Sequence, residues 1–504
     1  MTAPGTPLGV FLLGSKVGQI QRGEKGYQLT YEPGIRLPHP ISQTLRHQVS
    51  SEWPMPVHRY KGDAVWEATE SALGNFLFGL LPDNPDVLSE MSRRYGCEDR
   101  NPVELLSRVG LDCVGAVQFT QEGQPATPDR SALSPITPDG IEVALRTARE
   151  RGIRYEGAAQ GASPNETFRP GSLIAGFQPK FGLLSDGHDW LRSTPEWGTT
   201  HIFKTGIAGR EGQAAFEFAG MRAAALVGVE ASAVDFAEFG DEHALVVERF
   251  DRRWQDSDTP PARIHQEDLA QLLSVPVFPA GKKYGRDAKR IVKVLSSLEG
   301  GHEIAHAFVR QLAYNTLIGN ADAHLKNYSV RYDPDTGAPS MTPLYDCATD
   351  AHDPQFHSDA KSPVRIGGTV DHNAIQRSSV WWHNLSKSTS LDEARVMDDV
   401  RRLAREVPEA VFAATSALPA THRQRVEASG VREAIAEICT NVEDTIPRAQ
   451  TRGLAPKQQS ALLQNGHPEH KQASPARTRC GHPMPRARAQ CVAPAGHGGP
   501  HRSR

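Results

Sequence analysis

The feature that most constrains the fold of this chain is a mixed succession of strand and helix patterns in its middle part. Residues 201–206 and 243–254 have the pattern of buried strands, whereas residues 213–232 and 302–320 have the apolar spacing of helices. The second helical segment ends at a glycine and an asparagine, and a polar loop and a further strand pattern at 327–332 follow it. This mixture predicts an α+β fold.

The chain has 504 residues, which is more than a single hydrophobic core usually contains, so several domains are expected. Residues 8–31 predict antiparallel hairpins broken at Gly14 and Gly26, and Asn84 and Asn101, each followed by proline, predict helix starts. A stretch rich in Pro, Ser, Thr and Gly separates the first two units and is typical of a linker or a surface excursion. The expected units are an N-terminal subdomain (1–120), a sheet-containing lobe (141–260), a helical lobe (261–450) and a tail (451–504).

Composition favours a soluble globular protein, with 38% apolar and 23% charged residues and a mean hydropathy of −0.47. No apolar run reaches the roughly 18 residues that a membrane span needs. The opening "MTAPGTPLGV" lacks the basic and apolar regions of a secretory signal, and the six cysteines are too scattered for a disulfide framework. We therefore expect a cytoplasmic protein without a membrane span.

The C-terminal tail differs from the rest of the chain in charge. Residues 451–504 hold nine Lys and Arg against the single acid Glu469, a local charge of +8 that leaves −11 for residues 1–450. The acidic body argues against nonspecific binding of nucleic acid. The tail is expected either to be disordered or to bind Zn²⁺ through two thiolates and two imidazoles, namely Cys480, Cys491, His497 and His501.

The polar loop after the second helical segment carries the clearest chemistry. Asp322 precedes Asn327 by five residues, the spacing with which protein kinases place a catalytic base and a magnesium ligand. Lys326 could neutralise a transferring phosphoryl group, and Asp346 could supply a second Mg²⁺ ligand. Taken alone, however, Asp322 and Asn327 are better explained by Asx turns at a helix exit.

Segments upstream of this loop favour the kinase interpretation. Lys204 lies on a predicted strand, from which a lysine could pair phosphate oxygens, and Glu217 in the following helix could be its ion-pair partner. Glu248 and Phe250, at the end of a buried strand, could form a hinge that meets an adenine edge. A glycine-bearing turn before the lysine strand could cover phosphates, although its spacing fits neither the common kinase loop nor the Walker loop: Gly171, Gly176 and Gly182.

These segments resemble a known family, the HipA-type serine/threonine kinases, which are the toxin components of bacterial toxin–antitoxin pairs. The resemblance covers most of residues 8 to about 420 and follows the family's order: "FGLLPDNPDV", "LIAGFQPK", "HIFK", "VVERFDR", "RIHQEDLAQLLSVP", "IGNADAHLKN" and "PLYD". It implies a two-lobed, kinase-like fold with an N-terminal β-rich subdomain and a helical C-terminal lobe.

The resemblance also implies roles for the residues at matching positions. Asp322 would be the catalytic base, Asn327 and Asp346 the Mg²⁺ ligands, and Lys204 the phosphate-binding lysine. The implied ATP-binding set is completed by Gly176, Gln178, Glu248, Phe250 and Lys326. His265, Gln266, Glu267 and Asp268 match a further motif of the family. We interpret this motif as structural or as facing the peptide substrate.

One position departs from the family pattern. Members often carry an autophosphorylated serine three positions before the glycine that corresponds to Gly176, and this chain has Leu173 there, next to Ser172. Either Ser172 takes over the regulatory role, or the protein is not switched off by loop phosphorylation.

The resulting hypothesis is an ATP- and Mg²⁺-dependent serine/threonine-protein kinase that arrests growth. The resemblance implies a helix-turn-helix, HipB-like antitoxin as partner, contact with DNA only through that antitoxin, and an aminoacyl-tRNA synthetase as the first substrate to test. Two alternatives stay open, a small-molecule kinase on the same scaffold and a protein that acts chiefly as a corepressor with its antitoxin.

Overall fold

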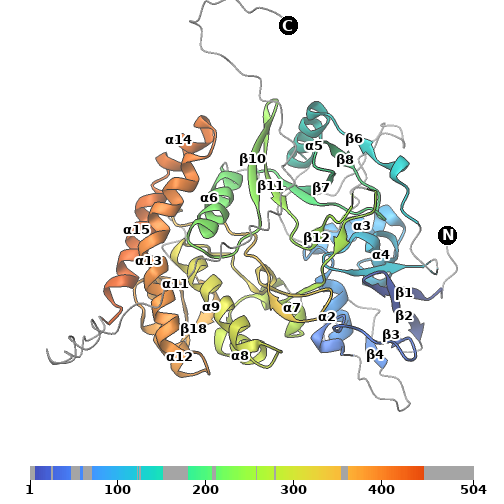
Figure 1. Ribbon diagram of the computed structural model, residues 1–504, viewed down its shortest axis with the longest axis horizontal. Helices are drawn as coiled ribbons and strands as arrows, with labels where there is room; N and C mark the ends of the chain where they lie inside the picture. Colours follow the sequence, from blue (N-terminus) through green and yellow to red (C-terminus); the bar gives the residue numbers. More distant parts are fainter. Residues whose placement is uncertain are drawn as a thin grey trace, which may run out of the picture.

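The structure is a computed structural model of the chain. It describes residues 6–23, 26–46, 57–60, 71–121, 123, 127–150, 180–206, 212–256, 258–276, 280–353 and 361–447. Figure 1 shows a blue N-terminal unit on one side, orange C-terminal helices on the opposite side, and a mixed unit of sheet and helices between them. None of the described helices has both the length and the apolar character needed to cross a membrane.

The N-terminal unit is an antiparallel sheet of order β4-β3-β2-β1-β5, packed against three helices. Its hairpin turns lie at Gly14 and Gly26, whose φ angles of 78° and 105° suit glycine, as the sequence predicted. Asn84 and Asn101 cap two of the helices, also as predicted. The elements are β1 (Leu8–Leu12), β2 (Ser15–Gly23), β3 (Gly26–Tyr31), β4 (Val57–Tyr60), α2 (Ala72–Gly79), α3 (Pro85–Tyr95), α4 (Pro102–Val109) and β5 (Val117–Thr120).

The second unit is a sheet of order β10-β11-β9-β7-β8-β6 between two helices. Ala244 and Val246 of its strand β11 pack on the α5 side, while Leu245 and Val247 pack on the α6 side, which explains the unbroken apolar run in the sequence. The elements are β6 (Ser134–Pro135), α5 (Pro138–Glu150), β7 (Lys180–Ser185), β8 (Trp190–Arg192), β9 (His201–Lys204), α6 (Gln213–Leu226), β10 (Val234–Phe239) and β11 (Glu242–Glu248).

The third unit is mainly helical and shares its core with α6. Short strands pair within it in the orders β12-β13, β14-β16-β17 and β15-β18-β19. The helices are α7 (Leu269–Leu272), α8 (Ala288–Leu295), α9 (Gly301–Leu317), α11 (His372–Gln376), α12 (Val380–Lys387), α13 (Glu393–Ser416), α14 (Ala420–Ala428) and α15 (Val431–Asp444). The strands are β12 (Arg252–Arg253), β13 (Ala262–Arg263), β14 (Gln266–Asp268), β15 (Arg286–Asp287), β16 (Ser329–Tyr332), β17 (Pro339–Met341), β18 (Lys361–Ile366) and β19 (Thr369–Asp371).

A buried cluster of charges joins the N-terminal unit to the sheet-containing unit. Asp112, which follows α4, forms ion pairs with Arg252 at 2.9 Å and with Arg249 at 3.4 Å. Both arginines follow β11 in the chain. Asp251 pairs with both arginines at 2.9 Å and accepts the backbone N–H of Gly115 at 2.7 Å. Because an unpaired charge would be costly here, the cluster fixes how the two units meet.

A second junction joins the N-terminal unit to the helical unit at Glu267. This fully buried carboxylate of β14 accepts hydrogen bonds from Ser42 Oγ at 2.8 Å, the Gln43 N–H at 3.0 Å and the Tyr332 hydroxyl. Of the two roles expected for its motif, Glu267 has the structural one. Burial raises its pKa to about 7, and the three hydrogen bonds only partly offset this.

This pKa predicts a pH-dependent stability. A carboxyl group whose folded-state pKa is raised from 4.5 to about 7 stabilises the fold below pH 4.5, and this contribution is lost as pH rises through 7. The loss amounts to roughly 3 kcal/mol when complete. Glu267→Gln cannot ionise, so the difference in unfolding free energy between the variant and the wild type should change by that order between pH 4.5 and 8. Urea unfolding at several pH values measures it, and a pH-independent difference would contradict the assignment.

Candidate functional site

One cleft lies between the sheet-containing unit and the helical unit. Its empty volume is about 1190 Å³, and its walls include residues from all three units. It contains the following residues that the sequence analysis selected: Lys204, Glu248, Phe250, Gln266, Asp268, Asp322, Lys326, Asn327 and Asp346. Glu217 lies behind the wall of this cleft and pairs with Lys204, which lines it. Glu267 is not among the lining residues, and its hydrogen-bond partners Ser42, Gln43 and Tyr332 do not line the cleft either.

Lys204 at the end of β9 is held by two carboxylates. Its ammonium lies 2.5 Å from Glu217 Oε1 on α6 and 2.6 Å from Asp346 Oδ1. Burial alone would lower the pKa of Lys204, but the two carboxylates outweigh it and hold this pKa above its usual value. Burial would likewise raise the pKa of Asp346, but Lys204 and Lys180 hold it below its usual range. The ammonium and the Asp346 carboxylate therefore both stay charged in the cleft.

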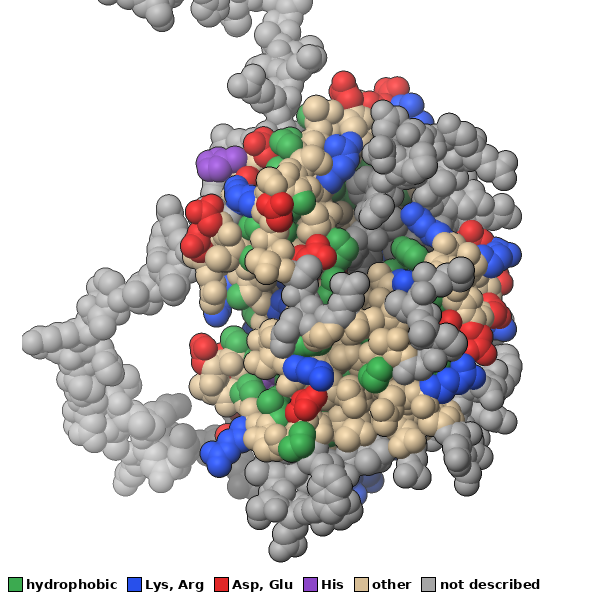
Figure 2. All heavy atoms as spheres, turned by 90° about the vertical axis from the view of Figure 1, so that its right-hand side faces the viewer, with side chains coloured by type: hydrophobic (Ala, Val, Ile, Leu, Met, Phe, Trp, Pro, Cys, Tyr) green, Lys and Arg blue, Asp and Glu red, His purple; other side chains and the backbone are tan. Residues whose placement is uncertain are grey.

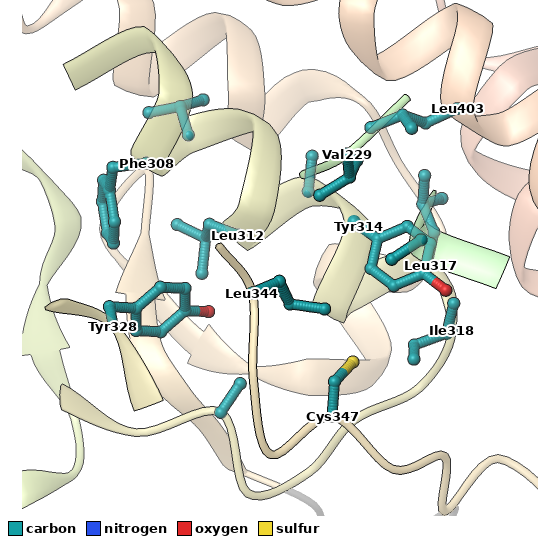
Figure 3. Close-up of a cluster of buried hydrophobic side chains, with 14 of the residues drawn as sticks. Val229, Phe308, Leu312, Tyr314, Leu317, Ile318, Tyr328, Leu344, Cys347 and Leu403 are labelled. Carbon is teal, nitrogen blue, oxygen red and sulfur yellow. The ribbon is translucent and has the colours of Figure 1, made fainter. Parts of the chain in front are cut away.

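The segment around Asp346 is anchored by its neighbours. Leu344 and Cys347 point into a buried cluster with Tyr314, Leu317 and other side chains of α9, as Figure 3 shows. Asp346 itself has a φ of 55°, a conformation that costs free energy for a residue other than glycine. The anchored neighbours hold the carboxylate in this orientation, so that it points into the cleft beside Lys204.

Gly220 sets the distance between α6 and this segment. A Cβ atom at position 220 would lie only 2.5 Å from the carbonyl oxygen of Cys347, and the Gly220 carbonyl accepts the Tyr314 hydroxyl at 2.5 Å. The close approach brings Glu217, one turn earlier on α6, within reach of Lys204.

The loop after α9 is held by amide side chains. As the sequence predicted, the helix stops at Gly319, whose φ is 72°, and Asn320 Oδ1 then accepts the N–H of Asp322 at 3.0 Å. Asn327 Nδ2 donates to the carbonyl oxygens of Asp322 at 2.9 Å and of Asp346 at 3.5 Å. These bonds use the amide nitrogen of Asn327 and leave its amide oxygen, with the Asp346 carboxylate, as hard ligands suited to Mg²⁺.

Asp322 stands at the mouth of the cleft, where 65% of its side chain is exposed. The hydroxyl of Tyr284 donates to its Oδ1 at 2.6 Å. Partial desolvation by the walls of the cleft raises the pKa of Asp322 to about 6; the hydrogen bond from Tyr284 opposes this shift, and the negative charge of Asp346 supports it. A carboxylate of this basicity can accept a proton from a hydroxyl group.

The cleft also gathers more lysines than the sequence analysis selected. Lys180 of β7 is the direct cross-strand partner of Lys204, and burial together with the charge of Lys204 lowers its pKa to about 8. Two like charges directly opposite each other destabilise a sheet unless anions offset them. Lys326 Nζ is buried and has no hydrogen-bond partner among the described residues. This donor set fits a ligand with several negative charges, such as a nucleotide polyphosphate.

The N-terminal unit contributes Asp83 to the cleft. The sequence had not identified Asp83 as part of the site. Its carboxylate forms a 2.7 Å ion pair with Lys283. Burial would raise the pKa of Asp83, but Lys326 and Lys283 hold it below its usual range. The only sequence signal here was the helix-start pattern at Asp83 and Asn84, which concerns α3 and says nothing of a contact 200 residues away.

Several selected residues lie outside the described part of the chain. These are two glycines of the predicted phosphate-covering turn with its Gln178, the regulatory position and the tail ligands: Gly171, Ser172, Leu173, Gly176, Gln178, Cys480, Cys491, His497 and His501. The third glycine, Gly182, was wrongly expected to border this turn, because it lies within strand β7 and pairs with Ile202 of β9. Within the described residues, no group of three or more His, Cys, Asp or Glu side chains could hold a metal ion.

Comparisons with known proteins agree with this architecture. The family model of the HipA N-terminal domain matches residues 8–120, and that of the HipA-like C-terminal domain matches residues 172–411. A putative kinase of Sinorhizobium fredii, Y4mE, is 31% identical over 353 residues, which are 67% of this chain and 77% of the relative. The serine/threonine-protein kinase toxin HipA of Shewanella oneidensis is 28% identical over 371 residues, which are 70% and 79% of the two chains.

A solved structure shows the same fold. It is the complex of HipA, HipB and operator DNA from the Shewanella oneidensis MR-1 toxin–antitoxin system, and its similarity covers 87% of this chain and 98% of that chain, with a TM-score of 0.69 and 23% identity. The fold and the cleft thus define a two-lobed, kinase-like α+β protein, and the predicted fold class is confirmed. With both of its domain models matched, the chain belongs to the HipA family.

The close approach of α6 to the Asp346 segment generates a prediction. Gly220→Ala improves helix propensity by about 1 kcal/mol, but its Cβ meets a backbone oxygen that cannot move aside, an overpacking that costs roughly 1–3 kcal/mol. We expect a net loss of about 1 kcal/mol in the free energy of unfolding, measured with urea. Ala225→Ser, at an exposed position of α6, is the control and should stay within about 0.5 kcal/mol of the wild type. Greater stability of Gly220→Ala would contradict the contact.

Proposed function

We propose that this chain is an ATP- and Mg²⁺-dependent serine/threonine-protein kinase that acts as a growth-arresting toxin. The observation that carries the proposal is the convergence of Lys204, Asp322, Asn327 and Asp346, from three separate segments, on one cleft. The names of the curated relatives, a serine/threonine-protein kinase toxin and putative kinases, support it.

In this proposal the nucleotide phosphates bind at the lysines of the cleft. Lys204 would bind phosphate oxygens in place of the Asp346 carboxylate while keeping its ion pair with Glu217. Asp346 and Asn327 would hold Mg²⁺, whose charge offsets that of the phosphates. The half-buried ring of Phe250, which tilts against Tyr345 at 5.6 Å between ring centroids, offers an apolar wall to the adenine.

Asp322 would act on the substrate hydroxyl. It would orient the hydroxyl and accept its proton while the oxygen forms a bond to the γ-phosphorus and ADP leaves. Lys326, buried and without a hydrogen-bond partner among the described residues, would stabilise charge on the transferring group. Catalysis would thus come from positioning and electrostatics.

The partner and substrate form the finer part of the proposal. The solved complex of the similar HipA contains HipB and operator DNA, which supports a HipB-like antitoxin as partner. We propose that this antitoxin is a helix-turn-helix protein and that DNA is contacted only through it. A translation factor such as an aminoacyl-tRNA synthetase is the proposed substrate. A phosphoproteome taken after brief induction of the protein would identify it.

Replacing the proposed base tests the chemistry. Asp322→Asn keeps the size of the side chain but cannot accept a proton, so transfer of labelled phosphate from ATP should fall by roughly 10²-fold or more, while ATP binding is retained. Asp235→Asn, at an exposed position of β10, is the matched control and should transfer phosphate at the wild-type rate.

Incubation with cell lysate extends this test to the substrate class. A labelled protein band that depends on Asp322 supports a protein kinase, whereas label found only in small molecules would favour the small-molecule kinase. Undiminished transfer by Asp322→Asn would remove Asp322 from the proposed role.

Deletion of the tail tests its independence from catalysis. The C-terminal family model ends at residue 411 and the last described helix at Asp444, so removal of residues 457–504 should leave ATP turnover unchanged. We propose one Zn²⁺ at the Cys/His cluster of the tail, so metal analysis should find one zinc per full-length chain and none in the truncated chain. Loss of ATP turnover, or zinc in neither protein, would contradict these two expectations respectively.

A further inference from the structure

A basic surface runs along α8 and the turn before it. It consists of Lys282, Arg286, Lys289, Arg290 and Lys293, all of them exposed or half-exposed, and we call it the α8 surface. The opposite side of the helix is fully apolar, with Ala288, Ile291, Val292 and Leu295 buried in the core. The only acid between residues 282 and 293 is Asp287, whose side chain caps α8 by accepting the Lys289 N–H at 2.9 Å.

The cations of the α8 surface are not neutralised by acids in the part of the chain that the structure describes. Within the described residues, none of the five forms an ion pair with a carboxylate. On the C-terminal helices, by contrast, exposed basic residues pair with acids, as in Arg395–Glu303 at 2.7 Å and Arg405–Glu443 at 2.5 Å. Figure 2 shows the face of the molecule that carries the N-terminal unit, and there too acidic and basic side chains lie next to each other.

This arrangement costs stability. Lys289 and Lys293 are one helical turn apart, and like charges at that spacing repel each other. Residues 1–450 carry a net charge of −11, so acids that could neutralise the helix are abundant in the sequence, yet none in the described part of the chain pairs with these cations. An unneutralised basic strip on an acidic body indicates a surface for an anionic partner.

The α8 surface begins at the mouth of the cleft. Arg286 Nε donates a hydrogen bond to the Lys282 carbonyl oxygen at 3.0 Å, and the turn that this bond closes also contains Lys283 and Tyr284. Lys283 lines the cleft, and the Tyr284 hydroxyl reaches Asp322 at 2.6 Å. A chain lying on α8 would therefore lead directly to the carboxylate that we propose as the base.

We propose that the α8 surface binds an acidic segment of the protein substrate next to the hydroxyl that is phosphorylated. This inference rests on the proposed kinase function and specifies its substrate class, a serine or threonine flanked by Asp or Glu. A short acidic peptide fits better than a long nucleic acid, because α8 has eight residues and is only about 12 Å long.

Peptide binding tests the surface without depending on catalysis. The probe is a fluorescein-labelled peptide with one serine between two runs of glutamate, titrated with full-length protein in the absence of ATP. A variant with Lys289→Glu, Arg290→Glu and Lys293→Glu should bind it roughly tenfold more weakly or worse, and binding to the wild type should weaken as salt rises. The control variant, Lys387→Glu with Arg405→Glu and Arg432→Glu, changes the net charge equally on other helices and should bind as the wild type does.

The outcomes separate this inference from the kinase proposal. Equal binding by the α8 variant and the wild type overturns the inference, even if both phosphorylate peptides. Tighter, α8-dependent binding of a single-stranded RNA oligonucleotide also overturns it, in favour of nucleic acid. Binding of the acidic peptide that requires the α8 surface supports it. If the peptide binds there but only other proteins are phosphorylated when ATP is added, the inference is overturned while the kinase proposal stands. Absence of phosphate transfer to any protein would count against the kinase proposal alone.

Discussion

The buried ammonium of Lys204 is the interaction on which the site depends. It joins β9, α6 and the segment of Asp346, so that three elements from two units meet at one charge. Such an ion pair is costly to break, because removal of one partner leaves a charge uncompensated in a low-dielectric interior. The glycine at position 220 and the left-handed backbone of Asp346 are local features that let the three elements come this close.

The N-terminal unit is part of the site and not only attached to it. Its docking is fixed by two buried charged groups, the Asp112 and Asp251 cluster with its arginines and the Glu267 carboxylate. The arginines follow the strand that ends at Glu248, on the cleft, so the docking interface and the nucleotide-facing wall share one segment. Through Asp83 the same unit adds a carboxylate to the cleft itself.

The sequence predicted much of this arrangement because the relevant signals are local. The helix stop at Gly319, the caps at Asn84 and Asn101 and the strand that carries Lys204 each follow from a few neighbouring residues. Lys180 was missed because its segment was interpreted as a glycine-bearing turn, and only the strand register of β7 and β9 places it opposite Lys204. The pairs Asp83–Lys283 and Tyr284–Asp322 depend on how separate segments pack, which no short pattern records.

The rate of phosphate transfer by a Glu217→Gln variant tests the central claim most directly. The amide keeps the shape of the side chain but removes the charge that holds Lys204, so the account predicts transfer at least tenfold slower than in the wild type, with the protein still folded. Glu230→Gln, which alters an exposed carboxylate paired with Arg331, should retain the wild-type rate. Transfer by Glu217→Gln at the wild-type rate would contradict the claim that the Lys204 ion pair organises the site.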